Sequence, residues 1–236
     1  MSEVIGRVVA LWRFPVKSMA GERLTQVELG WRGIKGDRQY GFHFAGSASR
    51  FPWFTGRDVS DMVRYRACFR DPADLKGSPI DVTAPDGECF GLDTPELRAR
   101  LSAGGGAPVA LMQCGRGLFD AMPVSLVTTA LQAALDEASG APVDPRRFRI
   151  NIVIDSDLRG EQWGERLLAF GAEDGPRLLV QEPIARCVMV TIDPDTATRT
   201  PAVLKTVVQR FGNRFGMYAS PARTGLIHEG DVVRLL

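Results

Sequence analysis

The stretch "EPIARCVMVTIDPDTATRTP", residues 182–201, decides how the fold is read. Its apolar, β-branched centre predicts a strand over residues 186–193, which runs directly into an Asp-Pro-Asp turn. Thr200 and Pro201 then supply the N-cap and first position of a helix, whose apolar residues keep to one face as far as Gly212. The apolar face of this helix is expected to pack on a sheet.

The rest of the chain shows the same pattern of short strands and few helices. Strands are predicted over residues 4–12, 23–29, 38–44, 147–155, 177–183 and 225–236. A hairpin with "PDG" at its tip is predicted over residues 78–92, and helices are predicted over residues 94–101 and 128–140. Many short strands with peripheral helices favour barrels or strongly curved sheets over a βαβ array. We therefore expect a β-rich α+β fold.

Length and charge limit the classes of protein that the chain can belong to. Its 236 residues can bury a substantial core, and the glycine-rich "GGGAP" marks a predicted boundary between domains of residues 1–106 and 107–236. A net charge of +1 provides no overall field for nucleic acid or a membrane surface, so neither partner is expected. With no cationic leader and no apolar run of about 20 residues, a cytoplasmic protein is predicted.

The cysteines and histidines do not form a familiar metal or hydrolytic motif. The four cysteines are widely spaced, with no CxxC pair and no histidine cluster, so neither zinc nor an iron–sulfur cluster is expected. His43 and His228 have no serine or cysteine partner in a recognised arrangement, and no Walker A or GxGxxG loop follows a strand. The ordinary interpretation of the cysteines is four buried thiols.

Cys187 is the cysteine whose sequence context favours a functional role. If residues 186–193 form a strand, Cys187, Met189 and Thr191 share its less apolar face, and Arg186 points to the opposite face. A nearby guanidinium favours the thiolate, which is the form that binds a metal or attacks an electrophile. Adjacency in sequence does not by itself distinguish this role from a structural one.

A second group of candidate residues is basic. Lys17 and Ser18 follow the proline that ends the first predicted strand, and Arg38 follows a glycine turn that allows close approach of a ligand. Arg149 and Asn151 share a face of the strand predicted over 147–155, where burial would be costly without a partner. Singly, each residue is well explained as a solvated or ion-paired surface group. If the cations converge, they could bind a phosphate through charge-assisted hydrogen bonds.

Seven motifs, in this order, carry a resemblance to a known family. They are "FPVKSMAGERL", "GIKGDRQYGF", "TGRDVSDMV", "RFRINIVID", "ARCVMVTIDPDT", "FGMYA" and "GLIHEGDVVRLL". The chain resembles the MOSC proteins, named for the C-terminal domain of molybdenum cofactor sulfurase. It is most similar to the two-part subgroup that includes the mitochondrial amidoxime-reducing component and its bacterial relatives. The resemblance implies an N-terminal β-barrel-like domain followed by a MOSC β-barrel with a few peripheral helices.

The resemblance also implies a molybdenum–molybdopterin cofactor, with Cys187 as the thiolate ligand of the metal and the catalytic residue. The implied cofactor-binding residues are Lys17, Ser18, Arg38, Arg57, Arg149, Asn151, Arg186 and Tyr218. Of these, Lys17, Ser18 and Arg38 are expected to hold the phosphate end of the pterin. A soft thiolate suits a transition metal, and a basic cluster suits the cofactor's anion. No pyridoxal phosphate is expected.

The chain departs from the family pattern at a few positions. Ala121 and Met122 stand where relatives often carry hydroxyl residues, so some cofactor contacts are expected to come from the backbone alone. The glycine that commonly follows the "DPDT" turn is absent, and no membrane anchor or ferredoxin domain is present in the sequence. Electrons are therefore expected from a separate donor, such as a ferredoxin, a flavin reductase or a cytochrome b5-like protein.

The activity that the resemblance implies is an oxidoreductase that reduces small N-hydroxylated substrates, such as hydroxylamines and amidoximes. The alternative is a non-catalytic carrier or docking module for the molybdenum cofactor, or for a persulfide on Cys187. A chain of this length has no room for the pyridoxal phosphate domain that generates persulfide, which argues against the second role. A third reading is a β-rich protein that binds another small anion.

Overall fold

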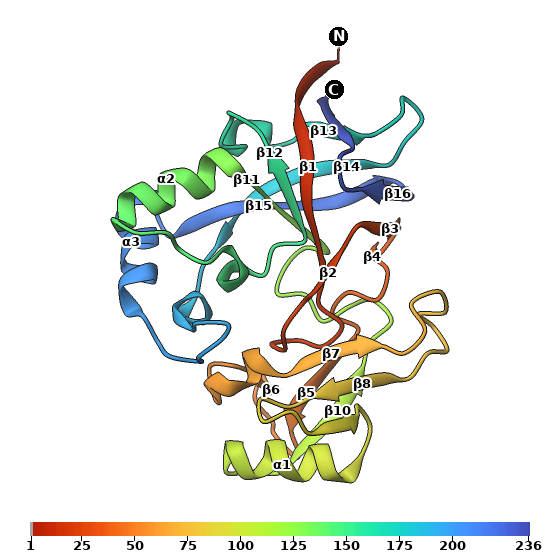
Figure 1. Ribbon diagram of the computed structural model, residues 1–236, viewed down its shortest axis with the longest axis vertical. Coiled ribbons are helices and arrows are strands. Elements are labelled where there is room, and N and C mark those ends of the chain that lie inside the picture. The colour runs from red at the N-terminus through yellow and green to blue at the C-terminus, as the bar shows by residue number, and fades with distance from the viewer. Residues whose placement is uncertain (1) are drawn as a thin grey trace.

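Seven strands close into a barrel, which forms the upper part of the molecule in Figure 1. In the computed structural model, which describes residues 2–236, they pair in the order β12, β11, β15, β14, β13, β17, β1, and β1 pairs again with β12. Their bounds are β1 (Glu3–Arg13), β11 (Val124–Thr128), β12 (Ile152–Asp155), β13 (Leu167–Phe170), β14 (Arg177–Ala185), β15 (Arg214–Arg223) and β17 (Val232–Leu235). Strand β2 (Glu22–Leu24) pairs with the end of β1. The β-rich α+β class is confirmed.

Apolar residues fill the barrel, and a glycine allows it to close. Val8, Leu11 and Leu126 are among the fully buried residues of this core. The register of β1 shifts at Gly6, where the strand passes from pairing with β17 to pairing with β12. A Cβ atom at Gly6 would lie 2.0 Å from the Asp155 carbonyl oxygen, and its φ of +154° disfavours other residues. Closure of the barrel therefore depends on the absence of a side chain here.

Three small sheets complete the β structure. Strands β5 (Tyr40–Phe44), β6 (Trp53–Phe54) and β10 (Val109–Gln113) form one, and β7 (Arg66–Phe69), β8 (Ile80–Thr83) and β9 (Cys89–Gly91) form another. The third contains β3 (Gln26–Gly30), β4 (Gly33–Ile34) and β16 (Gly225–His228). The first two pack around a separate apolar core and are covered by α1 (Pro95–Gly105) at the end opposite the barrel (Figure 1). The predicted hairpin over 78–92 is confirmed as β8 and β9.

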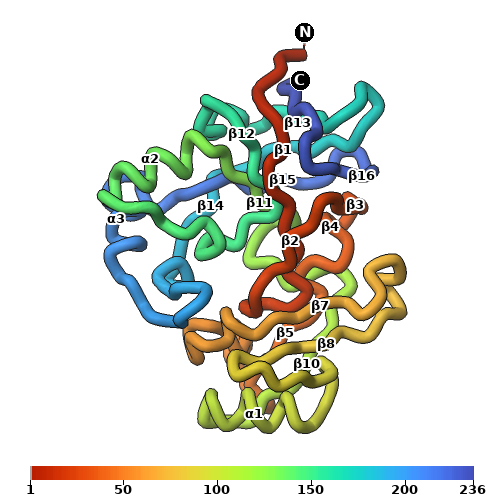
Figure 2. The backbone as a smooth tube through the Cα atoms, viewed as in Figure 1, coloured from red at the N-terminus to blue at the C-terminus, as the bar shows by residue number. Residues whose placement is uncertain are grey.

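Strand pairing crosses the predicted boundary after residue 106. Strand β1 belongs to the C-terminal barrel, β10 pairs back with β5, and β16 pairs with β3. Gly106 adopts the left-handed conformation that ends α1, so this glycine run is a helix terminus inside the fold. The tube in Figure 2 shows how the first strand, β1, runs into the barrel. The division into domains of residues 1–106 and 107–236 stays a prediction.

The three predicted helices are confirmed. They are α1 (Pro95–Gly105), α2 (Thr129–Ser139) and α3 (Pro201–Phe211). The Thr94 and Thr128 side chains cap the first two, and each of the three helices is followed by a glycine in the left-handed conformation. Helices α2 and α3 share a core with β11, β12 and β15 on one side of the barrel (Figure 1). None of the helices within residues 2–236 is both long and apolar enough to cross a bilayer.

Two of the predicted strands are wrong at the positions that bear on function. Strand β14 ends at Ala185, and residues 188–191 form the 3₁₀ helix η4 (Val188–Thr191). The hydroxyl of Thr191 donates to the Val188 carbonyl, which closes this turn. Strand β12 starts only at Ile152, after the 3₁₀ helix η2 (Pro145–Phe148). The alternation of side chains assumed for both segments therefore does not hold.

Candidate functional site

The nine predicted site residues all line one cavity. It has a volume of about 360 Å³ and lies where the end of the barrel meets the loops that follow β1 and β6. The predicted residues in its wall are Lys17, Ser18, Arg38, Arg57, Arg149, Asn151, Arg186, Cys187 and Tyr218. A larger cavity of about 710 Å³ adjoins it and shares Arg147, Arg149 and Met189. We assign the candidate site to the smaller cavity because the Cys187 thiol and all the predicted cationic residues lie in its wall.

The Lys17 loop follows directly from β1. Ser18 has a φ of +68°, which turns the chain sharply after Lys17. The Lys17 ammonium is only 10% exposed and donates to the Leu118 carbonyl at 2.9 Å and to an Asp120 carboxylate oxygen at 2.6 Å. Burial lowers the pKa of Lys17, against the opposing effect of Asp120. Lys17 is thus a buried cation that one exposed carboxylate partly neutralises.

Arg38 is held by a buried acid. Its neighbour Asp37 has a fully buried side chain that accepts from the Phe14 backbone N–H at 2.7 Å and pairs with the Arg38 guanidinium. Arg38 also donates to the Arg149 carbonyl at 2.7 Å and lies 4.7 Å from the centre of the Phe14 ring. This network fixes Arg38 in the cavity wall before any ligand is present.

Asn151 is occupied by protein partners. It is 1% exposed, and its Oδ1 accepts from the Ser125 backbone N–H, the Ser125 hydroxyl and Arg38 at 3.1, 2.9 and 3.3 Å. Its Nδ2 donates to the Trp12 carbonyl at 3.1 Å. These contacts join β1, β11 and the Arg38 loop. Its predicted contact with a cofactor remains a prediction, while its hydrogen bonds show a framework role.

Arg149 has hydrogen-bonding capacity left over. Its φ of +53° ends η2 in the left-handed conformation, which contradicts the predicted strand and separates it from the face of Asn151. One guanidinium nitrogen donates to the Met19 carbonyl, and the group lies 4.4 Å from the Phe14 ring centre. The other nitrogen, Nη2, is buried without a partner. Burial, then the charge of Arg38, lowers the pKa of Arg149 to about 9, so it remains charged at neutral pH.

Arg186 is tied to the backbone on both sides of the cavity. Its guanidinium donates to the Phe215 carbonyl at 2.8 and 2.6 Å and to the Phe148 carbonyl at 3.0 Å. Burial lowers its pKa to about 10, so this group also carries its charge at neutral pH. No carboxylate within residues 2–236 forms an ion pair with it. Arg186 therefore contributes positive charge to the cavity and holds the start of β15 against η2.

Cys187 lies just beyond β14 and opens the η4 turn. It is exposed, and its backbone carbonyl accepts from the Val190 N–H as η4 begins. Arg147 donates to the Thr191 carbonyl and to Asp193, both at 2.8 Å, and so anchors the segment after the thiol. The expectation of four buried thiols is wrong, because Cys68 and Cys89 are also exposed and Cys114 is half-buried.

Arg57 and Tyr218 complete the wall. Arg57 is exposed on the loop after β6, its Nε donates to the Thr55 hydroxyl at 3.4 Å, and its guanidinium lies 4.1 Å from the centre of the Phe51 ring. Arg199 donates to the Arg57 carbonyl at 2.9 Å, which ties this loop to the segment after η4. Burial raises the pKa of Tyr218, so its phenol stays protonated at neutral pH.

The cavity carries more positive than negative charge. Its cationic residues are Lys17, Arg38, Arg57, Arg147, Arg149 and Arg186. Lys17, Arg38 and Arg147 pair with Asp120, Asp37 and Asp193. For Arg57, Arg149 and Arg186 the structure gives no ion pair among residues 2–236. These three guanidinium groups give the cavity positive charge that no carboxylate balances, and a dianionic group has the charge to balance it.

Among the residues of the cavity wall that were not predicted from the sequence are Asp120, Ser125 and Arg147. The first two flank the start of β11, where polar residues at the head of a buried strand could have drawn attention. Arg147 follows Arg146, and the pair contacts Asp193 and Asp195 across the site. Two neighbouring arginines and two nearby aspartates are a visible pattern of opposite charges in the sequence, but the pattern does not show that these residues meet beside the cavity.

The fold and the cavity define a β-barrel protein with a basic cavity that has an exposed cysteine in its wall. Sequence comparison makes the class specific. The MOSC domain matches residues 115–234, and the MOSC N-terminal beta barrel domain matches residues 5–100. The chain belongs to the MOSC domain family, with its two-part architecture.

Among curated proteins, the chain is similar to molybdenum cofactor sulfurases of insects. It is 33% identical to that of Drosophila yakuba over 109 residues, or 42% of this chain, and 38% identical to that of Drosophila ananassae over 74 residues, or 30% of this chain. These regions span only 14% and 9% of the sulfurases' own length. The YUAD protein of Bacillus subtilis has a similar fold, with a TM-score of 0.53 at 12% identity over 100% of this chain and 96% of that one.

Proposed function

We propose that this protein is a molybdenum-cofactor-dependent oxidoreductase that reduces N-hydroxylated compounds with electrons from a separate protein. The observation that carries the proposal is the exposed Cys187 thiol in the same cavity as three guanidinium groups without carboxylate partners. A family related to molybdenum cofactor sulfurase supports a role connected with this cofactor.

The residues present fit such a cofactor. Molybdopterin carries a phosphate at one end and binds its metal through its own sulfur atoms, so the protein needs to supply cations and one soft ligand. Within residues 2–236 no three His, Cys, Asp or Glu side chains converge on a potential metal site, and Cys187 is the single thiol in the cavity wall. The unpartnered Nη2 of Arg149 is a donor that this cavity leaves unused.

Each part of the wall then has a task. Cys187 would ligate the metal, and Lys17, Ser18 and Arg38 would hold the phosphate, with Arg57, Arg149 and Arg186 adding charge. Bound cofactor would supply the two-electron chemistry of the reaction R–NHOH + 2e⁻ + 2H⁺ → R–NH₂ + H₂O. The chain's part is to orient the cofactor, balance its charge and leave the thiol side open to a small substrate.

A carrier role is the second candidate, favoured by the exposure of Cys187 and by the relatives named as sulfurases. In that role the protein would bind the cofactor, or sulfur on Cys187, and pass it to another protein. Both functions would use the same cavity, but only the oxidoreductase would turn over a substrate.

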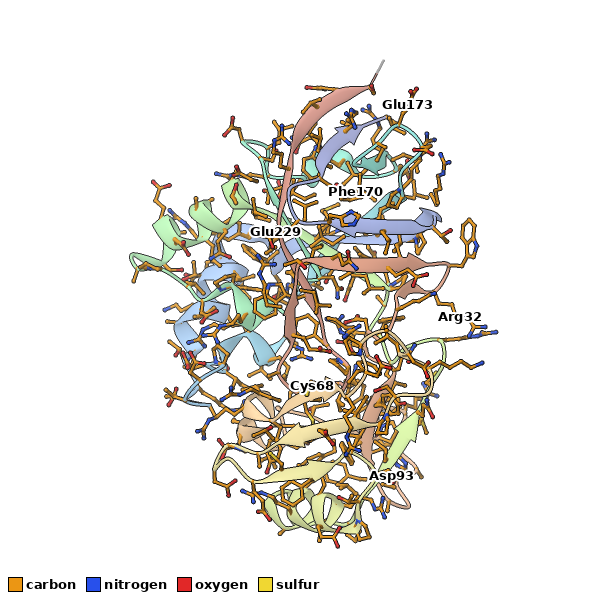
Figure 3. All side chains as sticks on the ribbon, turned by 45° about the vertical axis from the view of Figure 1, so that its right-hand side comes forward. Arg32, Cys68, Asp93, Phe170, Glu173 and Glu229 are labelled. Atoms are coloured by element: carbon orange, nitrogen blue, oxygen red, sulfur yellow. The ribbon has the colours of Figure 1, made fainter. Side chains whose placement is uncertain are left out.

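The test is to purify the protein from cells that make molybdopterin and to measure molybdenum and pterin. We expect Cys187→Ala to lose molybdenum at least about tenfold while retaining part of the pterin, because the guanidinium groups remain. Cys68→Ala is the matched control, since Cys68 is also exposed but lies on β7 (Figure 3) and does not line the cavity. Unchanged molybdenum in Cys187→Ala would remove the ligand assignment.

Turnover separates the two functions. Reduction of a hydroxylamine with dithionite-reduced viologen as electron source supports the oxidoreductase. Transfer of the cofactor to an apo-enzyme, without reduction of any hydroxylamine, supports the carrier.

A further inference from the structure

Asp120 supplies the one carboxylate among the described residues that line the cavity. It lies in the irregular segment between β10 and β11 and accepts from the Lys17 ammonium at 2.6 Å. Burial alone would oppose its ionisation, but Lys17, then Arg38 and Arg57, lower its pKa, so it is a carboxylate at neutral pH. A negative charge thus already stands in a site otherwise suited to an anion.

The two members of this ion pair differ in their access to water. The Asp120 side chain is 67% exposed, whereas the Lys17 side chain is 10% exposed. Lys17 is also fixed by its hydrogen bond to the Leu118 carbonyl. Turning Asp120 outward costs mainly its ion pair with Lys17, because most of its side-chain surface already faces water, whereas Lys17 cannot leave without losing both of its partners.

We propose that Asp120 is the resident counterion of this site and determines which anions it accepts. A dianionic group of the ligand takes the place of the Asp120 carboxylate on Lys17, and Asp120 turns outward into water. The inference rests on the proposed function in one respect, since it takes the cofactor's phosphate as the natural ligand.

Selectivity follows from counting charges. A monoanion that displaces Asp120 replaces one negative charge by another. Its new ion pair with Lys17 is therefore offset by the loss of the Lys17–Asp120 pair, and the net binding free energy is small. A phosphate dianion brings a second charge, which the guanidinium groups of Arg57, Arg149 and Arg186 can use. Asp120 therefore keeps small monoanions out and still admits a phosphate monoester, which is a dianion above its second pKa of about 6.

The experiment measures binding of inorganic phosphate and of formate to the full chain by calorimetry at pH 8. We expect Asp120→Asn to bind phosphate roughly three- to tenfold more tightly than the unmodified protein, and to begin to bind formate. Asp93→Asn is the matched control. Asp93 is an exposed acid that pairs with Arg98, at the end of the molecule away from the barrel (Figure 3).

Three results would overturn the inference: unchanged or weaker phosphate binding by Asp120→Asn, formate binding by the unmodified protein, or an equal effect of Asp93→Asn. Thermal unfolding of each variant checks that the fold is intact. The outcome is separable from that of the proposed function. If the unmodified protein carries molybdenum and pterin, but Asp120→Asn binds phosphate no more tightly, only the counterion role of Asp120 is refuted. If Asp120→Asn binds phosphate more tightly, but the unmodified protein never carries molybdenum, the counterion role stands and the proposed cofactor is refuted.

Discussion

Replacing Asn151 by alanine tests whether this residue serves the framework or the ligand. The buried amide makes four hydrogen bonds, to Ser125, Arg38 and Trp12, and truncation leaves those partners without it. At about 1 kcal/mol for each hydrogen bond, we expect a loss of about 3–4 kcal/mol in the free energy of unfolding. For a chain of this size, that corresponds to a drop in Tm of roughly 8–12 °C.

The assay is thermal unfolding followed by circular dichroism, together with phosphate binding measured below the transition. Gln113→Ala is the control, because this exposed amide makes one hydrogen bond, to the Tyr40 hydroxyl, and its removal should change the free energy of unfolding by no more than about 0.5 kcal/mol. We expect Asn151→Ala to lower the Tm strongly and phosphate affinity only through the freed Arg38. A Tm within about 2 °C of the original, combined with lost phosphate binding, would refute the framework role and make Asn151 a ligand contact.

Two further predictions concern charge and backbone. Because burial lowers the pKa of Lys17, its charge is lost as pH rises through a value below the ordinary 10.5, so phosphate affinity should fall in that alkaline range. Lys17→Ala should make this fall smaller without removing it, because Arg149 and Arg186, with pKa values of about 9 and about 10, lose their charge in the same range; a fall of unchanged size in the variant would contradict the role of Lys17. In Gly216→Ala a Cβ would lie 2.8 Å from the buried Leu126 carbonyl oxygen at a φ of +79°, so the free energy of unfolding should fall by roughly 3 kcal/mol. Gly212→Ala, which also has a positive φ but open space around it, should lose only about 1 kcal/mol in denaturant unfolding, and equal losses would contradict the steric argument.

The helices were predictable because their signals are local. Threonine before a helix, proline at its first position and glycine after it act within one or two turns, whatever surrounds the helix. Thr94 and Gly106 bound α1 in this way, and Thr128 and Gly140 bound α2. The strand that contains Gly6 was also predictable, although nothing in the sequence showed that it would close a barrel.

The segment around Cys187 was not predictable, because distant contacts override its strand-like composition. Residues 188–191 are rich in β-branched residues, yet they turn into η4, where α3 packs on them and Arg147 binds the Thr191 carbonyl. Arg149 is displaced from its predicted strand in the same way, at the left-handed end of η2. Local propensity is small beside such contacts, so only the folded chain decides between strand and turn.

The sequence by itself determined the β-rich class, the ends of three helices and the motifs whose residues line the cavity, although Thr200 makes no capping hydrogen bond at the start of α3. Only the tertiary structure decided which of the cations keep their charge without a carboxylate, since ion pairs such as Lys17–Asp120 join residues about a hundred positions apart in the chain. It also decided that the side chains of Asn151 and Arg186 form hydrogen bonds with other residues of the protein, and that Cys187 is exposed. The physical reason is that charge balance and burial depend on distances in space, to which the order of residues along the chain is only a partial guide.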